Sequence, residues 1–149
     1  MGNIFLGTYK HRIDEKNRLN LPSKIANKFN DHIVIVSKGF DGCLEVRGKN
    51  DFDLWSKQIL SYSQNKKDAR ILARQILANS VELEIDRTNR ILIPEVLKQL
   101  AYLKKNVTIV GLGNKLEIWD DKMYAKFVFE TNKQFETVAE RIDDNDNKK

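Results

Sequence analysis

A ten-residue phrase occurs twice in this chain, at residues 13–22 and again at residues 85–94. The two copies read IDEKNRLNLP and IDRTNRILIP, and five of the ten positions are identical. The tripeptides at 44–46 and 116–118 also lie 72 residues apart, which is the offset of the phrase. Two matches at one offset indicate an internal repeat. A half of this size would be only marginally stable by itself, so we expect the two halves to share one core as a pseudo-two-fold unit.

Each copy of the phrase is embedded in the same order of predicted elements. An alternating apolar segment leads into the phrase, and a proline ends it where a short helix can begin. A β-prone run follows that helix, at residues 33–36 and 107–110, and a glycine-containing turn then leads into a further strand. Helical periodicity closes the first half over residues 52–59 and 69–76. The local pattern is therefore repeated together with the letters.

A long helix is expected at the end of the second half, beginning at Asp120 or Asp121, either of which can cap it. Apolar residues recur along it at intervals of three and four, and a polar tail expected to be frayed follows at residues 143–149. The stripe can pack on its own domain or contact a neighbouring subunit. Its members are Tyr124, Phe127, Val128, Phe135, Val138 and Ile142.

Composition narrows the possible functions only partly. The formal net charge of +5 permits a polyanionic partner, but mixed charges are also ordinary on a protein surface. Cys43 is the only cysteine, which excludes an intramolecular disulfide and fits a reducing cytosol. No apolar run approaches the roughly 20 residues of a membrane span. The two histidines lie 21 residues apart without an obvious carboxylate pair, and we expect no metal site, no cofactor and no enzymatic activity.

The repeated phrase contains the pattern Asp-x-x-x-Arg between two predicted strands. An aspartate can accept hydrogen bonds from backbone N–H groups ahead of it and fix a tight turn, and Asn17 and Asn89 tolerate the positive φ that such turns demand. Arg18 and Arg90 would then leave a rigid turn at a defined angle. Each guanidinium offers a planar fork of donors that suits phosphate oxygens or the O6 and N7 edge of guanine.

Two interpretations of these turns remain open, although a carboxylate that staples an arginine can also orient it toward DNA. In one, the aspartates only staple the arginines and no ligand is bound. In the other, the arginines and their basic neighbours contact nucleic acid. The candidate nucleic-acid-binding residues are Lys10, Arg12, Asp14, Lys16 and Arg18 around the first copy, and Asp86, Arg87 and Arg90 in the second.

Taken together, the motifs resemble those of the MraZ family of transcriptional regulators over about residues 4 to 142. The resemblance depends on GTY at 7–9, IDEKNR at 13–18 with LP at 21–22, KGFDGCL at 38–44, KDAR at 67–70, EID at 84–86, residues 90–94 and LEIW at 116–119. One departure is that the family usually has glycine before each motif arginine, where this chain has Asn17 and Asn89. Asparagine is the next-best residue for positive φ, so the turn should survive.

The resemblance implies an α+β fold with a mainly β core, in the form of a pseudo-two-fold double-split, or swapped-hairpin, β-barrel similar to AbrB, with peripheral helices. It divides the chain into a first half at 4–79, a second half at 80–142 and the tail at 143–149. The family further implies a sequence-specific DNA-binding regulator of the cell-division and cell-wall gene cluster. Such a regulator binds short direct repeats in its own promoter region through the two Asp-x-x-x-Arg turns.

The resemblance also implies partners and a location. Double-stranded DNA and further copies of the chain in a ring-like homo-oligomer are the expected partners, without a membrane, and the protein is expected in the cytoplasm at the nucleoid. The alternative function is a ring-forming scaffold or protein-interaction module, which the long C-terminal stripe would serve.

Overall fold

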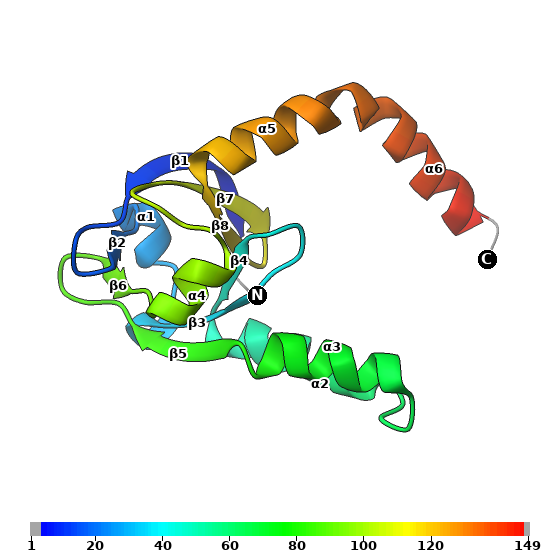
Figure 1. The fold of residues 1–149 in the computed structure, drawn as a ribbon, viewed down its shortest axis with the longest axis horizontal. Coiled ribbons are helices and arrows are strands. Elements are labelled where there is room, and N and C mark those ends of the chain that lie inside the picture. Colours follow the sequence, from blue (N-terminus) through cyan, green and yellow to red (C-terminus); the bar gives the residue numbers. More distant parts are fainter. Residues whose placement is uncertain (1–3, 148–149) are drawn as a thin grey trace.

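A six-stranded antiparallel sheet forms the centre of the computed structural model, which describes residues 4–147. Along the sheet the strands follow the order β1-β7-β8-β4-β3-β5 (Figure 1). The predicted α+β class with a mainly β core is therefore confirmed. The strands are β1 (Phe5–Arg12), β3 (Ile33–Lys38), β4 (Leu44–Arg47), β5 (Ser80–Glu84), β7 (Asn106–Gly113) and β8 (Leu116–Asp120).

The strand order reflects the internal repeat. The hairpin of β3 and β4 corresponds to the hairpin of β7 and β8, and β4 pairs with β8 at the middle of the sheet. The first strand of each repeat crosses to the other one, because β1 pairs with β7 and β5 pairs with β3. Reading the sheet from either edge therefore gives the same sequence of equivalent strands, and the pairs β1-β7, β5-β3 and β4-β8 each join one repeat to the other.

A second, two-stranded sheet lies apart from the first. It consists of β2 (Arg18–Asn20) and β6 (Arg90–Leu92), which are the strands inside the two repeated phrases. One set of buried side chains joins this ribbon to the large sheet, including Leu19 and Ile91 from the ribbon and Val34, Leu44 and Ile118 from the sheet. Within residues 4–147 no closed barrel is formed, since β1 and β5 are the open edges of the large sheet. The predicted swapped-hairpin barrel is therefore not confirmed.

Short helices follow the ribbon strands as expected. Pro22 directly precedes α1 (Ser23–Ala26) and Pro94 directly precedes α4 (Glu95–Leu100), with Ile25 and Leu97 buried beneath them. A 3-10 turn, η1 (Asn30–His32), leads from α1 toward β3. The predicted helical segments of the first half form α2 (Lys49–Ser61) and α3 (Lys67–Leu77), which lie side by side and project from one end of the body (Figure 1).

The outer side of β4 buries two charged side chains beneath α2. Arg47 Nη1 donates to Glu45 Oε1 at 2.6 Å, and Lys115 Nζ donates to Glu45 Oε2 at 2.9 Å. The Arg47 guanidinium also lies 4.6 Å from the centre of the Trp55 ring. Each buried charge therefore has an opposite partner, which is what low-dielectric surroundings require. Trp55 Nε1, by contrast, is buried without a hydrogen-bond partner among the described residues.

The C-terminal helix is broken where the sequence predicted a continuous one. The structure has α5 (Asp121–Thr131), the 3-10 turn η2 (Asn132–Gln134) and α6 (Phe135–Asn147), and Figure 1 shows them as a bent arm that projects from the body. Asp120 is the cap, because its side chain accepts from the Met123 N–H at 3.1 Å. The Thr131 hydroxyl donates to the Phe127 carbonyl at 2.7 Å, and such back-bonding bends helices.

The arm differs from the expectation in two further respects. Helix α6 extends to Asn147, into the segment expected to be a frayed polar tail, and residues 148–149 lie outside the described residues. The apolar stripe also divides into two parts. The ring centre of Phe127 lies 5.1 Å from the ring centre of Trp119 in the body, whereas Phe135 is 76% exposed. Over residues 4–147, no helix is long and apolar enough to cross a membrane.

Candidate nucleic-acid interface

The first repeated turn joins β1 to β2 and is held by one carboxylate. Asp14 Oδ1 accepts from the backbone N–H groups of Lys16 and Arg18, both at 2.9 Å, and Asp14 Oδ2 accepts from Arg18 Nε at 2.9 Å. Backbone bonds close the loop, from Asp14 N to the Arg18 carbonyl and from Asn17 N to the Asp14 carbonyl. Asn17 has a φ of 63°, as the sequence predicted for that position.

The second turn, between β5 and β6, repeats this frame. Asp86 Oδ1 accepts from the backbone N–H groups of Thr88 and Arg90 at 2.9 Å, and Asp86 Oδ2 accepts from Arg90 Nε at 3.0 Å. Asn89 has a φ of 66°. One bond is additional, because the Thr88 hydroxyl also donates to Asp86 Oδ1 at 3.0 Å. The predicted fixing of both turns by their aspartates is confirmed.

These hydrogen bonds keep both carboxylates ionised. The backbone N–H of Arg90 is the main cause that lowers the pKa of Asp86, with the hydroxyl and N–H of Thr88 and the Arg90 side chain adding to it, and that pKa falls to about 2. The backbone N–H of Arg18 likewise lowers the pKa of Asp14. At neutral pH each turn therefore presents a fixed anion and cation together, with the arginine oriented by its own turn.

Strand pairing brings the two turns side by side. Arg18 is opposite Leu92 and Asn20 is opposite Arg90 in the ribbon, and Ile93 N and Leu21 N donate across to the carbonyls of the two turn asparagines at 2.8 and 2.7 Å. Because Leu19 and Ile91 point into the core, the alternation of a strand directs their neighbours to the opposite face. Both turns lie at the end of the molecule away from the tips of α3 and α6 (Figure 1).

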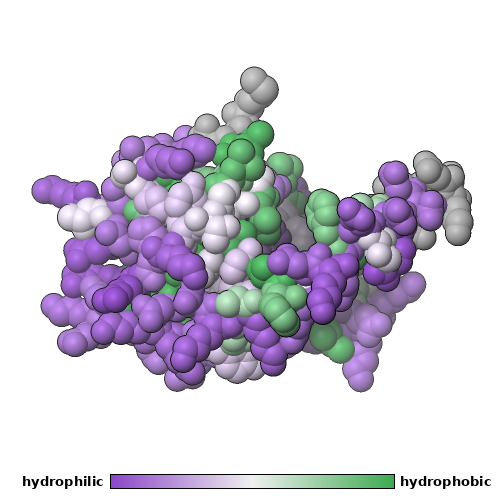
Figure 2. All heavy atoms as spheres, turned by 90° about the horizontal axis from the view of Figure 1, so that it is seen from above, coloured by the Kyte–Doolittle hydropathy of each residue, from purple (hydrophilic) through white to green (hydrophobic). Residues whose placement is uncertain are grey.

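The two arginines share that outward face and keep donors available. In each, Nε is bonded to its aspartate, and within residues 4–147 neither pair of Nη groups makes a hydrogen bond. About a third of each arginine side chain is exposed. Figure 2 shows hydrophilic side chains gathered at the end of the molecule that carries the turns. The arrangement offers two preoriented cationic forks to an acceptor-rich ligand.

The structure places the remaining candidate residues at different distances from this face. Lys16 and Arg87 are exposed within the turns themselves, and Arg12 is exposed at the end of β1 that enters the first turn. Lys10 lies further back along β1, where its ammonium bonds Asp121 at the start of α5 at 2.7 Å. Seven of the eight candidates are thus in the turns or adjoin them, and Lys10 is held by another element.

Sequence reasoning missed two residues that support the first turn from the other half. Asn17 Nδ2 donates to Glu95 Oε2 at 3.0 Å, and Lys98 Nζ donates to Asn17 Oδ1 at 3.0 Å. Both partners are on α4, about 80 residues further along the chain. Pro94, which opens α4 directly after the second phrase, was the available signal, since pairing the two phrases would bring α4 toward the first turn.

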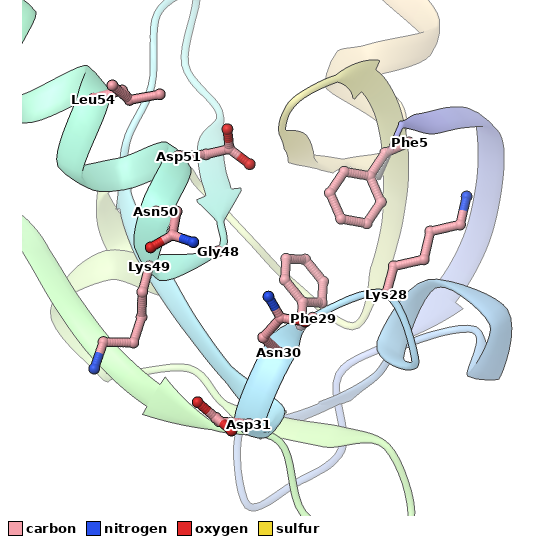
Figure 3. A pocket seen from close by; sticks show the side chains of 10 residues that line it. All are labelled: Phe5, Lys28, Phe29, Asn30, Asp31, Gly48, Lys49, Asn50, Asp51 and Leu54. Carbon is pink, nitrogen blue, oxygen red and sulfur yellow. The ribbon is translucent and has the colours of Figure 1, made fainter. Parts of the chain in front are cut away.

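A pocket of about 620 Å³ lies away from the turns, between the start of β1, η1 and the start of α2 (Figure 3). The stacked rings of Phe5 and Phe29 form part of its wall, and the carboxylates of Asp31 and Asp51 lie on opposite sides of it.

In the part of the chain that the structure describes, no group of three or more His, Cys, Asp or Glu residues could hold a metal ion. Burial, reinforced by Glu117 and Glu45, raises the pKa of the Cys43 thiol, so it stays protonated and unreactive.

The fold and the site define a class of protein: an interleaved α+β unit with two arginine turns on one ribbon. The family model described as "MraZ protein, putative antitoxin-like" matches residues 4–75 and again residues 76–146. The transcriptional regulator MraZ of Mesoplasma florum is 45% identical over 139 residues, which cover 93% of this chain and 95% of that protein. This chain belongs to the MraZ family.

Further relatives match over a similar length. The transcriptional regulator MraZ of Mycoplasmoides gallisepticum is 43% identical over 95% of this chain and 99% of its own. The transcriptional regulator MraZ of Oenococcus oeni is 36% identical over 96% of this chain and 99% of its own. The similarity therefore extends through both repeated turns and most of the C-terminal arm.

Proposed function

We propose that this protein is a transcriptional regulator that binds double-stranded DNA through its two Asp-x-x-x-Arg turns. The observation that carries the proposal is the pair of preoriented arginines on one face of the β2-β6 ribbon. A rigid cation costs little ordering entropy on binding, and guanidinium Nη groups match phosphate oxygens and guanine edges. The relatives' common name, transcriptional regulator, supports the same conclusion.

The proposed contacts differ in kind along the interface. Arg18 and Arg90 are the central contacts, and Asp14 and Asp86 act by orienting them rather than by touching an anionic ligand. Lys16, Arg87 and Arg12 are placed to meet phosphates at the margin, where exposed cations give affinity without sequence information. Lys10 would contact DNA only after leaving Asp121, so we expect the weakest contribution from it.

The finer proposals follow the family. We propose that the DNA target consists of short direct repeats in the protein's own promoter region, within the cell-division and cell-wall gene cluster, and that the protein is associated with the nucleoid. We also propose that the large sheet and the ribbon together correspond to the family's double-split barrel, since one core joins them. Each repeat of the DNA would be bound by one copy of the chain, so a multimer would add avidity.

The test is binding of the full chain to DNA upstream of its own gene and to scrambled DNA, in a salt series. Arg18→Ala should lower affinity for the upstream DNA by about tenfold to a hundredfold. Affinity of the wild type should fall steeply with salt because phosphate contacts release counterions. Arg74→Ala on α3 is the matched control, since it removes an exposed arginine far from the turns and should leave binding unchanged.

Folding of Arg18→Ala is measured alongside by circular dichroism. The first turn should persist, because Asp14 Oδ1 still accepts from two backbone N–H groups without the arginine side chain. Loss of folding would support the staple interpretation instead. A folded Arg18→Ala that binds as well as the wild type, or a wild type without preference for the upstream DNA, would contradict the proposal.

The exposed distal arm favours a second function, self-assembly into a ring-like scaffold. Phe129 and Phe135 are 73% and 76% exposed, and Ile142 is 57% exposed, on an arm that projects away from the body. Several large apolar side chains exposed on one short segment are typical of a surface that contacts another protein. We propose that this distal part of the arm contacts a neighbouring copy, while Tyr124 and Phe127 remain packed on Trp119 of their own body.

Light scattering on size-separated protein tests this assembly. Phe135→Glu should convert the multimer to smaller species, because it places a charge in the apolar contact. Thr137→Glu adds the same charge on the opposite face of α6 and should leave the multimer intact. If Phe135→Glu and Phe127→Glu both leave the assembly unchanged, the arm is not the contact and the scaffold proposal loses its support.

A further inference from the structure

The face that carries the two arginines also contains two side chains that differ in chemistry although they occupy matching positions in the two repeats. Arg18, Asn20, Arg90 and Leu92 are the outward positions of the β2-β6 ribbon. Arg18 and Arg90 occupy equivalent places in the two repeats. Asn20 and Leu92 are equivalent to each other in the same way, 72 residues apart, yet one is an amide and the other an aliphatic side chain.

Both residues are free to meet a ligand. Asn20 is exposed, and its side chain makes no hydrogen bond within residues 4–147. Leu92 is 57% exposed and lies opposite Arg18 in the ribbon. Packing explains neither residue, since the inward positions Leu19 and Ile91 supply the buried contacts. The outward pair is therefore available for recognition.

Their chemistry matches the two functional groups of an A·T base pair in the major groove. An asparagine amide can bond the N6 and N7 edge of adenine, and an aliphatic side chain can contact the C5 methyl of thymine. A two-stranded ribbon also fits the groove, because its strands lie about 4.8 Å apart and the groove is about 12 Å wide. The two arginines, placed diagonally beside this pair, supply charge complementarity to the DNA.

We infer that the outward face of the β2-β6 ribbon enters the major groove and that the unequal pair Asn20 and Leu92 gives it a direction of reading. This inference rests on the proposed DNA binding and deepens it. The two arginines alone, at equivalent places in the two repeats, would contact a DNA site and its inverted copy alike. With an amide at one end of the face and an apolar group at the other, the two orientations are no longer equivalent.

Selection from a library of randomised DNA duplexes tests the direction. The wild type should enrich an asymmetric sequence. Leu92→Asn and Asn20→Leu each make the two ends of the face equal and should enrich a sequence closer to its own inverted copy. The double exchange, Asn20→Leu with Leu92→Asn, should enrich a sequence with the preferences at its two ends exchanged, with about a tenfold loss on the wild-type site.

Two controls keep the outcomes separate. Leu54→Asn changes an exposed leucine on α2 in the same way and should enrich the wild-type sequence. All the exchanged positions are exposed, and thermal melting is used to check that each variant is folded. If the wild type enriches a sequence and the ribbon variants enrich the same one with equal affinity, the direction of reading is overturned while DNA binding stands. If the wild type enriches nothing, the proposed function fails as well.

Discussion

The turn at residues 13–17 and the turn at residues 85–89 have one backbone frame but different surroundings. In both, an aspartate accepts from two N–H groups and from an arginine Nε, and an asparagine adopts a positive φ. In the first turn, the Asn17 side chain makes further hydrogen bonds to Glu95 and Lys98, which lie outside the turn. In the second, the additional hydrogen bond lies within the turn, from the Thr88 hydroxyl to Asp86.

The cause of the difference lies in the residues that follow each phrase. Glu95 and Lys98 correspond, 72 residues earlier, to Ser23 and Ala26, which are too short to reach across the ribbon. The side chain of Asn89 accordingly makes no hydrogen bond within residues 4–147. Duplication therefore preserved the atoms that position the arginines, while the atoms around them diverged. Three predictions use this comparison, from the largest expected effect to the smallest.

The core beneath the ribbon should respond equally in the two repeats. Leu19 and Ile91 are opposite each other in the ribbon and are 0% and 1% exposed. We expect Leu19→Ala and Ile91→Ala each to lower the free energy of unfolding by about 2–5 kcal/mol, because each removes buried methyl groups and leaves a cavity. Urea denaturation measures it. Leu92→Ala, an exposed control, should change stability by less than about 0.5 kcal/mol. A large effect from one core variant alone would show that the repeats contribute unequally.

Replacing each turn asparagine by glycine should distinguish the two surroundings. Glycine adopts the positive φ without strain, and its entropic cost is similar at both sites, so the difference between Asn17→Gly and Asn89→Gly isolates the side-chain contacts. We expect Asn17→Gly to be the less stable variant by about 1 kcal/mol, since only it loses the bonds to Glu95 and Lys98.

A double-mutant cycle checks the origin of that difference. Adding Glu95→Ala should destabilise the wild type but have a smaller effect on Asn17→Gly, where its partner is already gone. Equal effects in both backgrounds, or equal stability of the two glycine variants, would mean that the contacts between Asn17 and α4 contribute nothing measurable.

The duplicated phrase allowed much of this site to be predicted from sequence. The positive φ of both asparagines and the fixing of each turn by its aspartate depend on local chemistry, and the structure has both. Contacts between residues far apart in the sequence were harder to predict. Two phrases that pair in space bring α4 to the first turn, but no local pattern records which side chains of α4 then reach Asn17.

The closed barrel, which is not confirmed, and the continuous C-terminal helix, which is wrong, were predicted from patterns with the same weakness. An open sheet and a closed barrel have identical strand patterns, and they differ only in whether the edge strands β1 and β5 find partners. The C-terminal stripe resumes at Phe135, seven residues or two helical turns after Val128, so periodicity alone predicted one helix across the break at η2. The side-chain bond from Thr131 to the Phe127 carbonyl marks the bend, and hydropathy does not reflect it.

The smallest expected difference between the turns is in how much stability each loses in acid through its aspartate. The pKa of Asp86 is about 2 in the folded state, below its ordinary value of 3.8, chiefly through the Arg90 N–H. Because the folded pKa is the lower one, this carboxylate stabilises the fold fully above about pH 4, and that contribution is lost as the pH falls toward 2. The pKa of Asp14 is lowered in the same direction but without a hydroxyl donor.

We therefore expect Asp86→Asn to flatten the dependence of stability on pH between about 4 and 2 more than Asp14→Asn does. Denaturant midpoints taken at several pH values in this window measure it. Thr88→Val removes the extra hydroxyl and should bring the acid response of the second turn close to that of the first. If Asp86→Asn and Asp14→Asn flatten the curve equally, the Thr88 hydroxyl does not distinguish the turns, and their difference is confined to the contacts of Asn17.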